Sequence, residues 1–165
     1  MSSKNLISEL EFERTSTQKL LERLPEDKLT WKPHPKAFTL GQLALHVATI
    51  PGRIATFANL GTTTAEVLVE HPLCEDKIKI VHSFGESFKT AIEILSNADE
   101  KWDSESWNCF LDDKEIINWP RPILLRFLML NHWYHHRGEL VTYLRTLGIL
   151  IPSIYGPSAD ENPFV

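Results

Sequence analysis

Apolar residues recur at helical spacing in four stretches of the chain, and each stretch predicts a long helix. The first covers about residues 4–24 and ends at Pro25, which cannot continue a helix. The second begins at Thr39, a suitable N-cap, and carries an apolar stripe that is interrupted by Pro51. Because proline removes one backbone hydrogen bond, we expect either a kink there or two shorter helices.

The two later stretches are separated by a segment of a different kind. The third helix is expected over about residues 75–101, and the fourth from about residues 120–122 to Leu147, with Gly148 as its stop. Between them, residues 107–119 hold two runs rich in β-prone side chains around a polar centre. This pattern predicts a short hairpin.

The connection between the second and third helices, residues 61–74, is longer than an antiparallel pair of helices needs. It could carry the chain back along a bundle, so that these two helices run parallel. The expected fold is therefore all-α, a four-helix bundle with a long crossover between helices two and three and a short hairpin before helix four. The length of 165 residues suits a single domain over residues 1–165.

Charge and composition argue against two classes of partner. A net charge of −5 leaves no basic surplus to neutralise phosphates, so we expect no nucleic-acid partner. No apolar run approaches the ~20 residues needed to cross a bilayer, and the N-terminus lacks the apolar core of a signal peptide. Cys74 and Cys109 fit no CxxC pattern, which favours free thiols in a reducing compartment. We expect a cytoplasmic protein with a small-molecule substrate and no membrane partner.

Three of the seven histidines crowd into the fourth helix, as His132, His135 and His136. A seam with steps of three and four residues runs along this helix and should face the core; it comprises Leu125, Met129, His132, His136, Leu140, Tyr143 and Leu147. His132 and His136 therefore lie one turn apart on the same face. His135 falls in a more polar row, which should face a rim or solvent.

Two histidines four residues apart on one helix face can chelate a single divalent metal ion. The best third ligand is His46, which lies in the apolar seam of the second helix. Three neutral imidazoles with an open fourth position form the arrangement of a catalytic zinc site, and nickel, iron or manganese also accept such ligands. The alternative is that each is a hydrogen-bonded core histidine, and spacing alone does not show that His46 reaches the other two.

Glu139 lies seven residues after His132 and so points nearly the same way. It is the candidate catalytic residue, because it could orient a ligand histidine, accept a proton or supply a ligand itself. The alternative is a solvated residue, or one paired with Arg137 or Arg145. The remaining histidines, expected to be surface residues in or near loops, are His34, His71 and His82.

Two motifs carry a resemblance to a known family. One is LNHWYHHRGEL at residues 130–140, continued by residues 143–145 and 152–161. The other is LGQLALHVA at residues 40–48, followed by Pro51-Gly52. Together they resemble the signature of the DinB family over nearly the whole chain, and the C-terminal motif is the more specific of the two.

The resemblance implies a four-helix bundle of DinB type with a long crossover, and a homodimer. It also implies a divalent metal, with zinc or nickel favoured, held by one histidine of helix two and two of helix four, here His46, His132 and His136. Some related proteins are S-transferases or isomerases that use a low-molecular-weight thiol such as bacillithiol, mycothiol or glutathione, and many have no assigned activity. The family often has glutamine where this chain has Glu139.

Three functions are compatible with these features. The first is a metal-dependent S-transferase that uses a low-molecular-weight thiol, which the resemblance alone favours. The second is a metal-dependent hydrolase in which Glu139 helps to move protons. The third is a non-enzymatic, stress-linked protein that binds metal or acts through interactions of a dimer.

Overall fold

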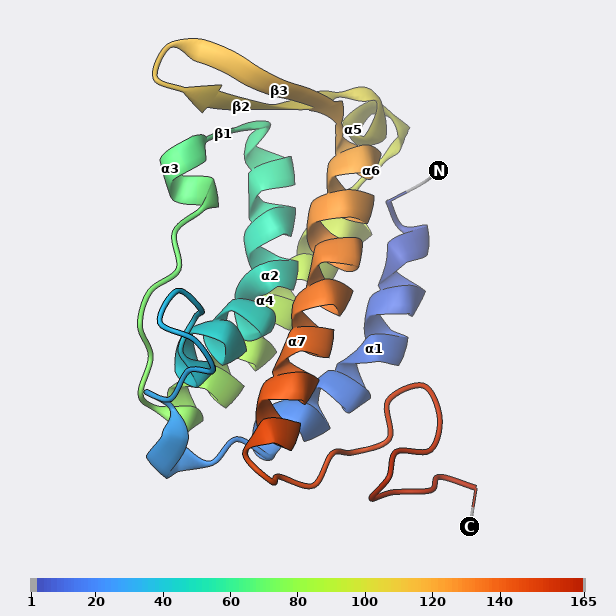
Figure 1. Ribbon diagram of the computed structural model, residues 1–165. Coiled ribbons are helices and arrows are strands. Elements are labelled where there is room, and N and C mark those ends of the chain that lie inside the picture. Colours follow the sequence, from blue (N-terminus) through green and yellow to red (C-terminus); the bar gives the residue numbers. More distant parts are fainter. Residues whose placement is uncertain (1–2, 165) are drawn as a thin grey trace.

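Four helical stretches run side by side in the computed structural model, which describes residues 3–164 (Figure 1). The first three are single helices, namely α1 (Asn5–Glu22), α2 (Leu40–Leu60) and α4 (Lys77–Asn97). The last joins three segments end to end, namely α6 (Arg121–Leu124), the π-helical η2 (Leu125–Asn131) and α7 (His132–Thr146). Shorter helices lie in the connections, and they are η1 (Glu26–Lys28), α3 (Ala65–Leu68) and α5 (Glu100–Ser104). The protein is therefore predominantly helical, as predicted.

Two of the predicted helices differ in detail from those observed. The third ends early, because α4 stops at Asn97 and Asp99 caps a separate helix, α5, by accepting a hydrogen bond from the Trp102 backbone N–H at 2.7 Å. The fourth was expected to be one regular α-helix, whereas residues 125–131 are π-helical. A π-helical stretch changes the backbone hydrogen bonds from a four-residue to a five-residue step but keeps its apolar side chains, so the hydrophobic pattern does not reveal it.

The central helix α2 buries most of its residues and packs against α4 and α7. It begins with a capping box, in which Thr39 Oγ1 accepts from the Gln42 backbone N–H and Gln42 Oε1 accepts from the Thr39 backbone N–H, both at 3.1 Å. The helix continues through Pro51 as one element, so the alternative of two shorter helices is wrong. Gly52 lets α4 approach closely, since a Cβ at this position would collide with the backbone of Ser87.

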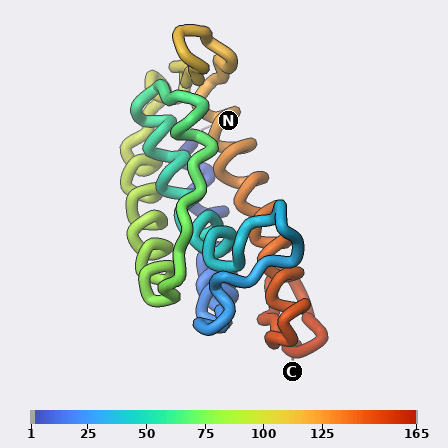
Figure 2. The backbone as a smooth tube through the Cα atoms, turned by 60° about the vertical axis from the view of Figure 1, so that its left-hand side comes forward, coloured from blue at the N-terminus to red at the C-terminus, as the bar shows by residue number. Residues whose placement is uncertain are grey.

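The crossover from α2 to α4 runs along the length of α2 (Figure 2). Both helices begin at the lower end of the molecule in Figure 1, so they run in the same direction. The end of the crossover lies tightly against the start of α2, because a Cβ on Gly41 would overlap the carbonyl oxygen of Cys74. Only glycine therefore fits at position 41, within the LGQLALHVA motif.

A small three-stranded sheet caps one end of the helices, and the all-α prediction needs correcting on this point (Figure 1). Its strands are β1 (Thr62–Thr64), β2 (Ser106–Leu111) and β3 (Lys114–Pro120). β2 and β3 form the predicted antiparallel hairpin, with Asp112 at a positive φ of 51° in the turn. β1 pairs in parallel with β2, so that Thr63 lies opposite Cys109. This pairing joins segments far apart in the sequence, and no local pattern predicts it.

The C-terminal tail folds back over the ends of the helices. Two ion pairs attach it, one between Arg145 and Asp160 at 2.6 Å and one between Arg23 and Glu161 at 2.5 Å. Between residues 3 and 164, none of the helices combines the length and the apolar character needed to cross a bilayer.

Candidate metal centre

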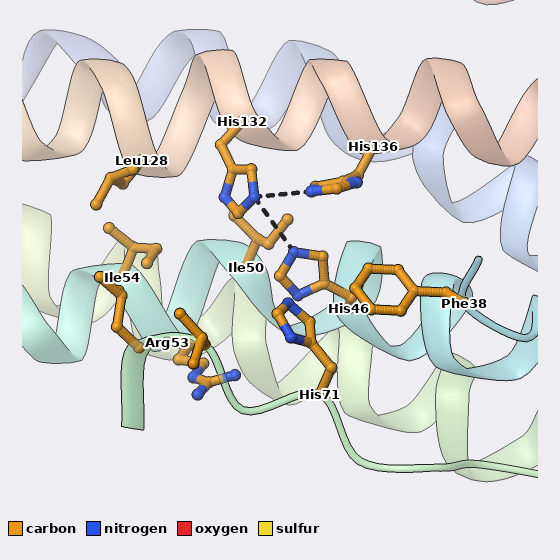
Figure 3. Close-up of a pocket in the computed structure, with 11 residues that line it drawn as sticks. Phe38, His46, Ile50, Arg53, Ile54, His71, Leu128, His132 and His136 are labelled. Carbon is orange, nitrogen blue, oxygen red and sulfur yellow. Dashed lines mark hydrogen bonds between the residues drawn. The ribbon is translucent and has the colours of Figure 1, made fainter. Parts of the chain in front are cut away.

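The three histidines singled out in the sequence meet between α2 and α7. His46 comes from α2, and His132 and His136 come from successive turns of α7 (Figure 3). His132 Nε2 lies 3.4 Å from His46 Nε2 and 2.8 Å from His136 Nε2. One nitrogen from each of the three rings lies within 4.8 Å of the others. The structure thus brings His46 to the helical pair, which spacing alone could not show.

The geometry of the three nitrogens fits a divalent metal ion. Zinc–imidazole distances of ~2.0–2.1 Å in a tetrahedral site place the nitrogens about 3.3 Å apart. The 3.4 Å between His46 and His132 matches this spacing, and the 2.8 Å between His132 and His136 requires the two rings to separate by about 0.5 Å. An N–H of one ring can satisfy only one neighbouring lone pair well, whereas a metal ion would satisfy all three.

The electrostatic surroundings keep these rings neutral, which metal ligation requires. Burial, reinforced by the neighbouring imidazoles and Arg53, lowers the pKa of His46 to about 2. Burial also lowers the pKa of His132 to about 4. The pKa of His136 is lowered by burial as well, although Glu139 opposes that shift. At neutral pH all three side chains therefore offer lone pairs rather than positive charge.

Glu139 contacts one member of this trio from behind. Its Oε2 lies 2.5 Å from His136 Nδ1, while Nε2 of the same ring faces His132. A carboxylate that accepts the Nδ1–H fixes the tautomer and directs the Nε2 lone pair toward the centre. The alternative pairing of Glu139 with an arginine is not found, because Arg137 pairs with Glu13 and Arg145 with the tail. Glu139 therefore lies behind His136, on the edge of that ring away from His132.

A hydrogen bond next to the site ties α7 to α2. Pro51 has no N–H, so the carbonyl of Val47, four residues earlier, lacks its usual partner within the helix. The indole Nε1–H of Trp133 donates to that carbonyl oxygen at 3.0 Å. Trp133 follows His132 and Val47 follows His46, so this bond holds together the two turns that carry these candidate ligands.

A fourth histidine, which the sequence did not single out, lies beside the trio. His71 was expected on the surface, but its ring centroid is 4.4 Å from that of His46 and 4.7 Å from that of Phe38. Gln42 of the α2 capping box holds the segment in place by donating from Nε2 to the His71 carbonyl at 3.0 Å. His71 lies on an irregular segment with no periodicity, so no pattern could orient it. His34, His82 and His135 are exposed, as expected.

A cavity of about 220 Å³ opens beside the histidines (Figure 3). Its polar lining consists of the four histidines and Arg53. The rest of the lining is apolar and comprises Phe38, Ile50, Ile54, Leu68, Val69 and Leu128. A small molecule in this cavity would therefore contact the open side of the three-nitrogen cluster.

Comparison with known proteins identifies the family. The model of the DinB family matches residues 1–162, which is nearly the whole chain. The chain belongs to the DinB family. DinB proteins generally bind metal, and the cluster of His46, His132 and His136 is the corresponding candidate site in this member.

Relatives of this DinB protein agree with the assignment. It is 29% identical over 156 residues to the uncharacterized protein YrdA of Bacillus subtilis strain 168, covering 92% of this chain and 86% of YrdA. A solved DinB-like protein of Bacillus cereus ATCC 10987 has a TM-score of 0.70 at 24% identity, over 91% of this chain and 95% of that one. YjoA, a DinB-like protein of Bacillus subtilis, has a TM-score of 0.69 at 19% identity, over 91% of this chain and 96% of YjoA. The two structures share the fold.

Proposed function

We propose that this DinB protein binds a divalent metal through His46, His132 and His136 and uses it as an S-transferase with a low-molecular-weight thiol. The observation that carries the proposal is the convergence of three neutral imidazole nitrogens on one point beside a cavity. When bound, the metal would lower the pKa of a thiol at the open position and so favour its nucleophilic form at neutral pH. The family resemblance favours a thiol as the partner, such as bacillithiol, mycothiol or glutathione.

The donor set narrows the choice of metal. Three imidazoles without a thiolate or carboxylate suit zinc and nickel, and also accept iron or manganese. Glu139 makes His136 a better donor through its contact with Nδ1 at 2.5 Å. The resident metal is therefore proposed to be zinc or nickel.

The position of Glu139 bears on the rival hydrolase hypothesis. A hydrolase would need a proton acceptor close to the open side of the site. The Glu139 carboxylate is engaged with Nδ1 of His136, on the opposite edge of that ring from His132. We therefore assign Glu139 the positioning of a ligand and rank the hydrolase below the S-transferase. The cavity beside the cluster likewise favours an enzyme over a protein that only stores metal or forms interactions. A homodimer in the cytoplasm is the proposed working state.

A conjugation screen tests the proposal directly. The protein reconstituted with zinc or nickel is incubated with each of the three thiols and a panel of electrophiles, and product is measured by mass spectrometry. We expect turnover that needs both metal and one thiol, and none from a His132→Ala/His136→Ala variant. Equal product from the wild type and that variant across the panel would refute the S-transferase.

A further inference from the structure

Arg53 occupies the side of the cavity opposite His132 and His136 (Figure 3). It lies on α2, two turns after His46. Its guanidinium donates to the carbonyl of Glu70 at 2.7 Å and to the carbonyl of Val67. These bonds attach the crossover to α2 and hold the guanidinium at the cavity wall.

The charge of Arg53 has no close counter-ion in the part of the chain that the structure describes. No carboxylate between residues 3 and 164 comes within 4.0 Å of its guanidinium. Burial lowers the pKa of Arg53, and the more distant carboxylate of Glu70 only partly offsets this. A half-buried guanidinium that bonds neutral carbonyls retains donors and charge for an anion.

The space between Arg53 and the histidines suits a small apolar body. The wall there is formed by Ile54 of α2, Leu128 of η2, and Leu68 and Val69 of the crossover. A volume of about 220 Å³ equals the share of about seven water molecules in the liquid. A molecule of roughly seven to ten non-hydrogen atoms, with most of its surface apolar, would fill it.

We propose that the cavity binds a small monoanionic molecule, with its anionic group on Arg53 and its apolar body against Ile54 and Leu128. The other end of such a molecule would lie next to the three-histidine cluster. If the proposed S-transferase is correct, this molecule is the electrophilic co-substrate, a short acid that also carries either an activated double bond, which takes up the thiol sulfur and a proton, or a leaving group, which departs as the new C–S bond forms. The binding of the anion itself depends on Arg53 and the cavity, not on a metal.

Calorimetric titration with two matched probes tests this inference. Hexanoate and hexanamide share an apolar chain and nearly the same shape, and only hexanoate carries a charge. We expect the wild-type protein to bind hexanoate about ten- to a hundredfold more tightly than hexanamide, the range of one charge-assisted hydrogen bond. Arg53→Gln should reduce that preference to about twofold or less. Arg53→Lys, which loses the guanidinium bonds to the Glu70 and Val67 carbonyls but retains the charge, should preserve most of the preference for hexanoate.

Two further variants locate the binding. Leu128→Trp should fill the cavity and abolish binding of both probes. The His132→Ala/His136→Ala variant should retain the preference for hexanoate, which separates this inference from the fate of the proposed metal enzyme. A wild type that binds neither probe, or shows no preference, would overturn the inference. So would a preference that survives Arg53→Gln, or one that disappears in the double histidine variant, since the carboxylate would then lie on the histidines or on a metal.

Discussion

The hydrogen bond from Trp133 to Val47 makes a specific prediction about the stability of the region around the site. Pro51 deprives the Val47 carbonyl of its partner within α2, and the Trp133 indole supplies one at 3.0 Å. The side chains of Val47 and Trp133 are both fully buried, so water cannot replace the indole N–H as a donor. Trp133→Phe keeps the aromatic body and removes the N–H, which leaves a buried carbonyl without a partner.

The expected cost has two parts. An unsatisfied buried carbonyl costs about 1–3 kcal/mol, and the smaller ring leaves a cavity that costs roughly 1 kcal/mol. Pro51→Ala restores the N–H that bonds Val47 within the helix, so in that background only the cavity cost should remain. The double-mutant cycle should therefore show that Trp133→Phe is less destabilising by about 1–3 kcal/mol when Pro51 is alanine.

Urea unfolding of the four metal-free proteins measures this coupling through the free energy of unfolding. Pro51→Ala alone serves as the control, because it changes the helix without touching the indole. An equal cost of Trp133→Phe in both backgrounds, within about 0.5 kcal/mol, would refute the idea that the indole compensates for the proline.

Three further predictions concern the charges in and around the site. Glu139→Ala should weaken metal binding by about ten- to a hundredfold in a competition titration with a chelator, and Glu139→Gln, which still accepts the His136 Nδ1–H, should lose less. The metal-free protein should lose stability as the pH falls below about 6.5. In the folded protein the pKa of His46 is lowered to about 2 and that of His132 to about 4, so these rings stay neutral, whereas in the unfolded chain they take up protons. At pH 5 each such ring should cost about 2 kcal/mol in urea unfolding, and the loaded protein should release its metal below about pH 6. Arg137→Met should lower the free energy of unfolding by about 3–5 kcal/mol, because it leaves the buried Glu13 carboxylate without its partner at 2.6 Å. The double variant Arg137→Met/Glu13→Leu should recover much of that loss, and an equal loss in both variants would contradict this explanation.

The parts of the fold and site that could be predicted from the sequence are those with a local period. His132 and His136 repeat at the helical step within an apolar seam, so their common face follows from the sequence alone. The hairpin before the last helix is also local, since its two strands lie close in sequence on either side of Asp112. In these cases the physical cause lies within a few residues of the effect.

The parts that could not be predicted depend on contacts between distant segments. His71 reaches the site because Gln42 and Arg53 hold the crossover against α2. The strand β1 forms only where it meets β2, more than forty residues later. The role of Trp133 follows from a proline in another helix. A single sequence does not show which residues of two distant segments lie opposite one another, so these features needed the structure.

The metal content of the purified protein tests the central claim most directly. Untagged wild-type protein and the His132→Ala/His136→Ala variant are analysed side by side for their elements, before and after reconstitution and removal of excess metal. A three-histidine site predicts about one zinc or nickel ion per wild-type chain and none in the variant. No metal in the reconstituted wild type, or equal metal in both proteins, would contradict it and make these histidines ordinary members of the core.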